Sequence, residues 1–355
     1  MKLAVLFGGV SSEHEVSCLS AASILRNLDS DKYDIHAVGI TKEGAWRYYP
    51  HHDPDRVEDG SWASQPSLIP AILSPDRATH GMVLHGGAGE AVRLDCVFPV
   101  LHGEGGEDGA VQGLLELAGI PYVGCGVAAS ANSMDKSITK VLVEQAGVRQ
   151  ARYYLALRHD FARDPEGVVR AAADAIGSYP VFVKPCSQGS SVGVAKAGDR
   201  AALAEGLSAA FRYDHKVLVE EYVDGQEVEC AVLGNQAPVA SPVGEIAPTQ
   251  AFYTFDAKYH DASSKLYIPA RITDEQRETV RQNALRVYAA LGCRGLSRVD
   301  FFVRRADGAV VFNELNSIPG FTSISMYPKL FDHAGMRYPA LLDRLIELAL
   351  EAHNG

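Results

Sequence analysis

The chain has 355 residues, enough for two or three domains, and its 47% hydrophobic and 22% charged residues are typical of a globular protein. Its formal net charge of −11 argues against a nucleic acid or an anionic membrane surface as a partner, because both require a basic face. It begins directly with an apolar strand and contains no run of about 18 apolar residues, so we expect no membrane span and a cytoplasmic location. The six cysteines include no C-x-x-C pair and are typical of reduced thiols.

Apolar strands alternate with helices in the first third of the chain. Residues 2–7 form one buried strand that ends at a Gly-Gly pair, and residues 94–101 form another that runs into the sequence HGEGGEDG and a helix at 110–118. Further strands are expected at 33–40 and 45–49. This alternation predicts a parallel sheet with helices on both faces. Residues 53–90 show no regular pattern.

Two side chains follow the ends of these strands. His102 stands where open α/β sheets place ligands, and its position favours a ligand contact and a structural role equally. Glu13 lies in the loop that leads into the first helix. An acid there suits an ammonium group better than a phosphate, although the segment alone favours a partner for the helix dipole. The G-x-G-x-x-G spacing is absent, so a dinucleotide site is not indicated.

The middle of the chain carries a candidate phosphate loop. A helix capped by Asp135 is followed by a strand at 181–184, on which Phe182 and Lys184 share a face. The small residues at 187–193 can close over phosphates with backbone N–H groups, or form a plain Gly-Ser turn. No acid adjoins Lys184 in the sequence, so we expect it to need an anionic partner.

Two strands at 217–223 and 226–235 flank an Asp-Gly turn. They form either an exposed hairpin or an adenine site at a domain hinge, with Tyr222 as the aromatic wall and Glu227 reaching the ribose. The aromatic, poorly periodic residues 250–268 predict a lid loop. A helix capped by Thr273 then leads to the last third of the chain.

Residues 295–330 predict a hairpin, a Pro-Gly loop and the start of a helix. Arg298 and Asp300 lie two apart on the first strand and therefore share a face, and Glu314 and Asn316 do the same on the second. If the two faces coincide, three oxygen-bearing side chains converge, which suits Mg²⁺ completed by phosphates and water. The alternative is a solvated strand face. The amphipathic tail at 338–353 predicts a core or interface helix.

Taken in order, these stretches resemble an ATP-grasp carboxylate–amine ligase of the D-alanine:D-alanine ligase family. The resemblance spans the chain and rests on eight motifs: FGGVSSEHEVS, LHGEGGEDG, MDKSITK, VKPCSQGSSVGV, EEYVDGQEVE, FDAKY, SRVDFF and NELNSIPGFTSISMYP. It implies an α/β, ATP-grasp fold of three α/β domains, the first Rossmann-like. The expected boundaries are 1–132, 133–219 and 220–355, with the lid at 250–268 in the third domain.

The resemblance also implies an activity. The family joins two D-alanines into D-alanyl-D-alanine for peptidoglycan precursor synthesis, with ATP as co-substrate and an acylphosphate intermediate. Two Mg²⁺ ions per site, replaceable by Mn²⁺, and a homodimer are implied as well. The alternatives are a D-alanine:D-serine or D-lactate ligase of the same family, and a catalytically inactive nucleotide-binding regulator.

By family position, the resemblance implies four groups of site residues. In the catalytic group, Glu13 would bind the ammonium of the first D-alanine, and Arg298 and the Gly320 N–H would face the oxyanion. Ser190 and Tyr259 would close the site. The ATP-binding group is Lys136, Lys184, Ser191, Glu220, Glu221, Tyr222, Val223, Glu227 and Lys258. The amino-acid group is His102, Ser325 and Met326. The metal ligands are Asp300, Glu314 and Asn316.

Overall fold

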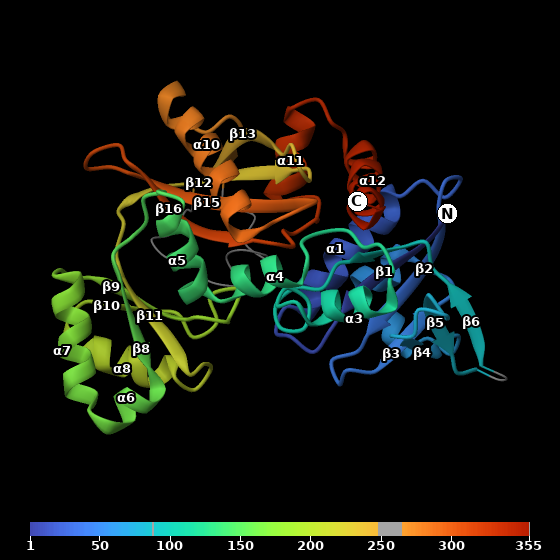
Figure 1. The fold of residues 1–355 in the computed structure, drawn as a ribbon, viewed down its shortest axis with the longest axis horizontal. Coiled ribbons are helices and arrows are strands. Elements are labelled where there is room, and N and C mark those ends of the chain that lie inside the picture. Colours follow the sequence, from blue (N-terminus) through green and yellow to red (C-terminus); the bar gives the residue numbers. More distant parts are fainter. Residues whose placement is uncertain (87–88, 248–264, 355) are drawn as a thin grey trace.

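The computed structural model describes residues 1–86, 89–247 and 265–354, and it contains three sheets that follow one another along the chain (Figure 1). The N-terminal sheet has the strand order β6-β5-β4-β3-β2-β1-β7. Its strands are β1 Lys2–Gly8, β2 Asp34–Ile40, β3 Trp46–Tyr49, β4 Ile69–Leu73, β5 Gly81–Leu84, β6 Glu90–Arg93 and β7 Cys96–Pro99. The helices of this part are α1 His14–Asn27, α2 Pro54–Glu58, the 3₁₀ helix η1 Ser61–Ser64, α3 Ala110–Ala118 and α4 Val127–Met134.

The expectation of a parallel N-terminal sheet is correct only for its centre. Strand β1 pairs in parallel with β2 and β7, whereas β3, β4, β5 and β6 pair antiparallel. The view that residues 53–90 lack regular structure is wrong, because they contain α2, η1, β4 and β5. These strands have only four or five residues each, too few for a clear alternation to stand out among the prolines and glycines.

The second and third sheets are antiparallel and are covered by helices. The four-stranded sheet has the order β10-β9-β11-β8, with α7 and α8 packed on it; the five-stranded sheet has the order β14-β13-β12-β15-β16, with α10 and α11 packed on it (Figure 1). The bounds are α5 Lys136–Gln145, β8 Tyr153–Leu157, α6 Arg158–Arg163, α7 Pro165–Ile176, β9 Val181–Pro185, β10 Ala195–Ala197, α8 Arg200–Ala210 and β11 Lys216–Glu221. They continue with β12 Gly225–Leu233, β13 Val239–Ala247, β14 Lys265–Tyr267, α10 Asp274–Leu291, β15 Leu296–Arg304, β16 Val310–Asn316, α11 Met326–His333 and α12 Tyr338–Asn354.

Strands β11 and β12 are consecutive in the chain but belong to different sheets. The exposed hairpin considered for this region is therefore wrong, and the three residues between them form a passage from one sheet to the next. The predicted boundary at 219/220 falls inside β11, and the one at 132/133 falls inside α4. The division into three domains at these positions stays a prediction.

The hairpin of β15 and β16 has the predicted register. Asp300 lies opposite Glu314 and Arg298 lies opposite Asn316, so the polar residues of both strands share one face. The predicted helix caps are also present. Asp135 accepts from the backbone N–H groups at the start of α5, and Thr273 forms a capping box with Gln276 at the start of α10.

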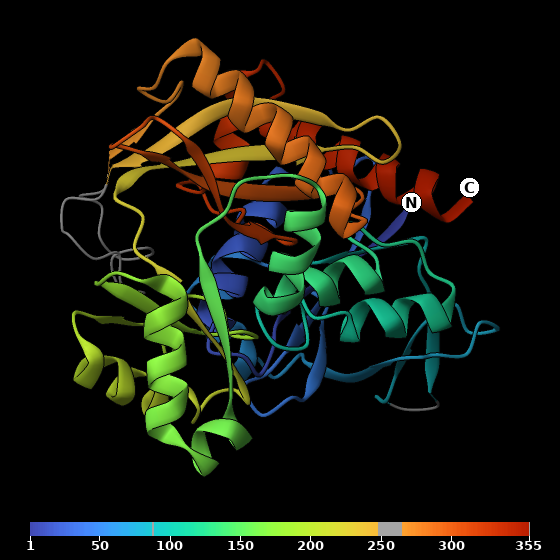
Figure 2. The same ribbon diagram turned by 60° about the vertical axis from the view of Figure 1, so that its left-hand side comes forward.

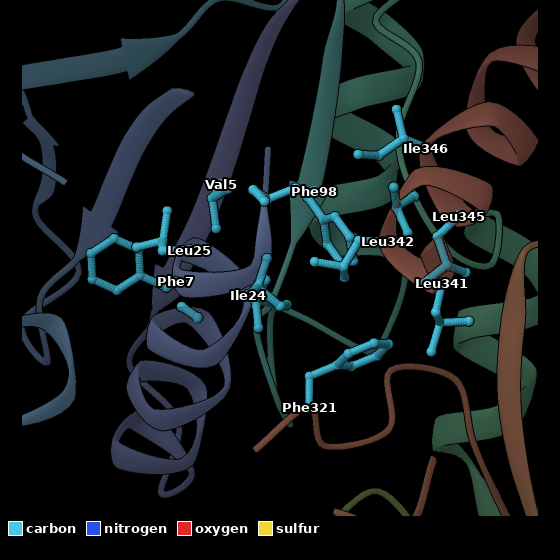
Figure 3. Packing of buried hydrophobic residues seen from close by; sticks show 14 of the residues in the cluster. Val5, Phe7, Ile24, Leu25, Phe98, Phe321, Leu341, Leu342, Leu345 and Ile346 are labelled. Carbon is cyan, nitrogen blue, oxygen red and sulfur yellow. The ribbon is translucent and has the colours of Figure 1, made fainter. Parts of the chain in front are cut away.

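The last helix of the chain returns to the first sheet. In both ribbon views α12 lies beside the N-terminal part, and Figure 3 shows its leucines facing Phe98 of β7 and Phe321 (Figures 1, 2 and 3). These side chains belong to one buried cluster with Phe7 of β1 and Ile24 of α1. The N- and C-terminal parts are thus joined through an apolar core, which fixes the loops at the carboxyl ends of β1 and β7 relative to the loop after β16. Within the described ranges, no helix is long and apolar enough to cross a membrane.

Candidate active site

A cavity of about 1150 Å³ lies where the three sheets meet. Glu13 lines it from the N-terminal part, Lys184 from β9 and Glu314 from β16. All the predicted site residues in the described ranges line this cavity except Asp300, which is buried behind Arg298 and Asn316 and hydrogen-bonded to both. Lys258, Tyr259 and most of the predicted lid at 250–268 lie outside the described residues.

Arg298 is held by carboxylates on two neighbouring strands. Its Nε and Nη2 donate to the two oxygens of Asp300 at 2.8 and 2.7 Å, and its Nε lies 3.0 Å from Glu229 Oε2 on β12. Burial disfavours the charged guanidinium, but these carboxylates outweigh burial and raise the pKa of Arg298 well above its usual value. Arg298 is therefore a fixed cation at the cavity wall, suited to an anion that develops there.

The carboxylate of Glu13 is tightly enclosed. Ser190 Oγ donates to Glu13 Oε1, which joins the N-terminal part to the loop after β9. A Cβ added at Gly189 or Gly103 would stand 2.6 or 2.8 Å from Glu13 Oε2, so only glycine fits at either position without moving the carboxylate. Glu13 is 7% exposed. A buried carboxylate at the cavity wall suits a cationic substrate group such as an ammonium.

The loop after β9 has an unusual backbone. Ser190 and Ser191 have φ values of 47° and 62°, a left-handed conformation that side chains other than Gly, Asn and Asp rarely adopt. Lys136 Nζ donates to Gln188 O at 2.7 Å, and this bond ties the loop to the first turn of α5. Backbone strain of this kind is common where a loop is shaped around a ligand.

Lys184, which has no acid beside it in the sequence, has an anionic partner from the protein itself. Its Nζ lies 2.6 Å from Glu220 Oε2 on the adjacent strand β11. Glu221, the next residue, accepts instead from the backbone and side chain of Arg152. Both carboxylates are thus engaged with cations of the protein, so any contact of residues 220 and 221 with adenine would fall mainly to their backbone.

The passage between β11 and β12 carries an aromatic surface. Tyr222 is 42% exposed, its ring lies 6.0 Å from that of Phe182, and Lys196 Nζ stands 4.2 Å from its centroid. Val223 and Glu227 line the same part of the cavity. A partly exposed aromatic ring at the cavity wall is suited to a planar heterocycle.

His102 is buried at the end of the cavity near the N-terminal part. Its Nε2 lies 3.2 Å from Ser20 Oγ, which accepts from the N–H of Phe321 at 3.2 Å. Burial lowers the pKa of His102, with Glu13 opposing this effect, so the imidazole is neutral at neutral pH. It can donate a hydrogen bond but does not supply a positive charge.

Gly320, Ser325 and Met326 lie around the start of α11. Ser325 Oγ accepts from the N–H of Thr322 at 3.0 Å, and a Cβ at Gly320 would stand 2.9 Å from that oxygen. Met326 lines the cavity but is only 4% exposed; its sulfur would lie 2.5 Å from a Cβ at Gly244. Most of the Met326 side chain therefore belongs to the core, and only part of it can form a substrate wall.

Two family models match the chain. One, described as D-ala D-ala ligase N-terminus, matches residues 2–125, and the other, D-ala D-ala ligase C-terminus, matches residues 142–347. The chain belongs to the D-alanine–D-alanine ligase family. The D-alanine–D-alanine ligase of Acetivibrio thermocellus is 50% identical over 99% of this chain and 96% of its own length, and that of Caldicellulosiruptor bescii is 47% identical over 100% and 96%.

Solved structures of the family share the whole fold. The VanG D-Ala:D-Ser ligase from Enterococcus faecalis has a TM-score of 0.88 and 40% identity, covering 98% of this chain and 99% of that one. The D-alanine–D-alanine ligase from Coxiella burnetii has a TM-score of 0.86 and 35% identity, covering 100% and 96%. The three-part α/β architecture is therefore the ATP-grasp fold of these ligases, which are ATP-dependent enzymes.

The donor set of the hairpin fits a divalent metal of the kind these ligases use. The described residues contain no cluster of three or more His, Cys, Asp or Glu side chains that could hold a metal without other ligands. Asp300, Glu314 and Asn316 offer only hard oxygen donors, with the Asn316 amide now donating to Asp300 Oδ2 at 3.0 Å. This set suits Mg²⁺, which binds through one or two carboxylates plus substrate phosphates and water.

Three charged residues of the ligase site were missed by sequence reasoning. Lys140 contacts Glu220, Glu229 contacts Arg298, and Glu107 lies between two loops and accepts hydrogen bonds from both. Two signals in the sequence were available. Glu229 stands on a strand that carries alternate acids, and Glu107 lies in the Gly-rich loop after β7. For Lys140, four residues after Lys136 in a helix, spacing alone indicated a neighbour of Lys136 and nothing more.

Proposed function

We propose that this protein joins two D-alanine molecules into D-alanyl-D-alanine with hydrolysis of ATP to ADP and phosphate, as a step in the synthesis of peptidoglycan precursors. The observation that carries the proposal is one cavity lined by Glu13, Lys184 and Glu314, which come from three different sheets or their loops. Glu13 can bind an ammonium group, Lys184 a polyphosphate, and Glu314 a metal ion that carries the phosphoryl group.

In the first step, a carboxylate oxygen of the first D-alanine attacks the γ-phosphorus of ATP, and ADP leaves. Glu13 binds the ammonium of this amino acid, and His102 lies near its carboxylate. Lys136 and Lys184 bind the ATP phosphates, and Lys258 reaches the transferred one. The protein's contribution is to align the reactants and to neutralise charge.

In the second step, the uncharged amine of the second D-alanine attacks the acyl carbon. The bond from that carbon to the phosphate oxygen breaks, and phosphate leaves with one proton from the amine as the peptide bond forms. Ser325 and the N–H of Met326 receive the carboxylate of this second amino acid. Arg298 and the N–H of Gly320 face the oxygen that becomes negative. The ion pairs of Arg298 support this role, because a fixed cation need not reorganise when the charge develops.

The remaining ATP contacts and the metal complete the proposal. The backbone of residues 220–223 and the ring of Tyr222 contact adenine, Glu227 the ribose, and Ser191 the phosphates. Asp300, Glu314 and Asn316 would hold two Mg²⁺ ions, or Mn²⁺ in their place. Bound metal offsets the negative charge that builds on the transferred phosphoryl group. Ser190 joins Glu13 and Tyr259 in closing the site over the acylphosphate.

A D-alanine:D-serine ligase is the second candidate, because the VanG D-Ala:D-Ser ligase is 40% identical to this chain over nearly its whole length. The apolar Met326 beside Ser325 favours D-alanine. A D-serine hydroxyl buried against a thioether without a hydrogen-bond partner would lose about 1–3 kcal/mol.

The test is phosphate release with ATP, Mg²⁺ and D-alanine, compared with D-alanine plus D-serine or D-lactate, with the products identified by mass. We expect D-alanyl-D-alanine as the main product. Phosphate release that no amino acid stimulates would contradict the ligase assignment. The proposed homodimer is tested by sedimentation of the same preparation.

A further inference from the structure

One buried lysine near the nucleotide end of the cavity has no assigned role. Lys140 of α5 is 2% exposed, and its Nζ lies 2.6 Å from Glu220 Oε1. The other oxygen of the same carboxylate, Oε2, lies 2.6 Å from Lys184 Nζ. Glu220 therefore bridges the amino groups of two lysines, and we call the three residues the Lys-Glu-Lys cluster. Burial lowers the pKa of Lys140 and the charge of Glu220 opposes this effect; with both lysines protonated, the cluster carries one net positive charge.

The strand order creates this cluster. Strand β11 lies between β9 and β8, and Lys184 of β9 pairs with Leu218 of β11. Glu220 follows Leu218 by two residues, so its side chain lies on the same face of the sheet as Lys184. Tyr153 of β8 is directly opposite Glu220, and its ring centroid is 5.7 Å from Lys140 Nζ. Glu220 thus receives one cation from β9 and one from α5, which packs over β11.

The two lysines differ in their access to the cavity. The side chain of Lys140 is 3% exposed, whereas that of Lys184 is 18% exposed. Only Lys184 has an appreciable surface that an incoming phosphate can reach. Under the proposed function, Lys184 binds the ATP phosphates, so the nucleotide must compete for this ammonium with Glu220.

We propose that Lys140 is a positioning residue that keeps Glu220 neutralised, so that Lys184 is available to the phosphates of ATP. A buried carboxylate with a single counter-ion holds that ion tightly, because losing it leaves an uncompensated buried charge. With Lys140 on its other oxygen, Glu220 remains paired when Lys184 turns to the nucleotide. This inference rests on the proposed function for its ligand, but nucleotide binding tests it without any ligation.

The charge state of Glu220 gives the inference a second consequence. Burial disfavours the carboxylate, but Lys140 and Lys184 outweigh burial and lower the pKa of Glu220 to about 2. The titratable groups around it are Lys140 from α5, Lys184 from β9, Tyr153 from β8 and its neighbour Glu221. In the unmodified protein Glu220 therefore stays ionised between pH 5 and 8, and its hold on Lys184 does not change.

The experiment is titration of the full chain with a non-hydrolysable ATP analogue and Mg²⁺, followed by calorimetry, for the unmodified protein and Lys140→Met. We expect Lys140→Met to weaken binding at pH 7.5 by about tenfold, because Lys184 is then the only counter-ion of Glu220 among the described residues. Val141→Ala, on the exposed side of α5, is the matched control and should bind normally. Unchanged affinity in Lys140→Met would overturn the proposal, as would a lowered melting temperature with unchanged affinity.

Two further measurements separate this role from a structural one. Removing Lys140 should raise the pKa of Glu220, so protonation on going from pH 8 to pH 5 should release Lys184. We therefore compare the affinity of Lys140→Met with that of the unmodified protein at each pH, so that protonation of the nucleotide affects both equally. The ratio of the two affinities should rise towards one at pH 5. Adding Lys140→Met to Glu220→Gln should have little further effect, since no carboxylate remains to be neutralised. A pH-independent ratio, or the same loss in the Glu220→Gln background, would overturn the proposal.

The result can be distinguished from a failure of the proposed function. If the unmodified protein binds the analogue but does not ligate D-alanine, the ligase assignment fails while the role of Lys140 is still measured. If it ligates D-alanine and Lys140→Met shows normal affinity, only the role of Lys140 fails.

Discussion

Glu107 Oε1 accepts a hydrogen bond of 3.1 Å from the backbone N–H of Ile318, 211 residues further along the chain. Its other oxygen, Oε2, accepts from the N–H of Gly103 at 2.9 Å. One carboxyl group therefore connects the loop after β7 with the loop after β16. Gly320, whose N–H is proposed to face the oxyanion, follows two residues after Ile318. The position of this donor thus depends on a residue of the N-terminal part.

Replacing Glu107 with Gln should weaken this connection above about pH 8, where Glu107 is ionised, because an amide NH₂ would face one of the two N–H donors. We expect a loss of about 1–3 kcal/mol in the free energy of unfolding and a fall in turnover of roughly tenfold or more as Gly320 shifts. Chemical denaturation and phosphate release measure the two effects. Glu104→Gln, at an exposed position of the same loop, is the control. Equal turnover in both variants would exclude the connection as a catalytic requirement.

Glu107 also predicts a pH dependence of stability. Burial, and secondly the charge of Glu13, raise its pKa from 4.5 to about 8. Between these two values the folded protein keeps a proton that the unfolded chain releases, so Glu107 reduces stability progressively as the pH rises from about 5 to 8. Glu107→Gln has no proton to lose there, and its free energy of unfolding should fall less over this range. Urea unfolding at pH 5.5 and pH 8 measures this change in each protein. An equal fall in the free energy of unfolding for both proteins would contradict the raised pKa of Glu107.

Glu314→Gln should fold normally and lose nearly all ligase activity. The substitution removes one carboxylate charge from the proposed metal ligands, and an interaction of this type is worth about 3 kcal/mol or more, so turnover should fall at least roughly a hundredfold. Asp307→Asn removes a charge from the turn of the same hairpin, outside the cavity lining, and is the matched control. Near-normal turnover of Glu314→Gln at saturating Mg²⁺ would remove this residue from the site.

Arg298→Lys tests the fixed cation. A lysine cannot donate to both oxygens of Asp300 while also reaching Glu229, so a buried carboxylate loses its partner. We expect a stability loss of about 3 kcal/mol and a turnover reduced about a hundredfold, measured by denaturation and by product formation. Arg304→Lys, on the same strand with an exposed ion pair to Asp307, should change either quantity little.

Met326 tests the choice of the second amino acid. We expect Met326→Gln to narrow the preference for D-alanine over D-serine by offering a hydrogen-bond donor to the serine hydroxyl. It should also lower the free energy of unfolding by about 1–3 kcal/mol, because the side chain lies in the core. Arginine there should cost more, since Gly244 and Leu330 leave no room for it. Met326→Leu, a change of similar volume, should keep the preference. Competition between equal D-alanine and D-serine, read by mass, checks this. Predominant D-alanyl-D-serine from the unmodified protein would overturn the D-alanine assignment.

Several features of this protein were predictable from sequence because they depend on neighbours in the chain. The turn at Asp307 and Gly308 sets the pairing of β15 with β16, and the two-residue period of strands then places Asp300 and Glu314 on one face. Caps such as Thr273 act within one helical turn. The order of the motifs along the chain indicated the family, which the comparisons confirm.

The charge partners within the site were decided only by the tertiary structure. Lys184 has no acid beside it in sequence, yet Glu220 lies 2.6 Å away because β11 pairs with β9, although β11 begins 31 residues after β9 ends. Lys140 contacts the same carboxylate from a separate helix, α5. Strands β11 and β12 look like a hairpin locally but pair with different sheets. Strand order and helix docking follow from burial of apolar surface across the whole chain, a free-energy balance that no short stretch contains.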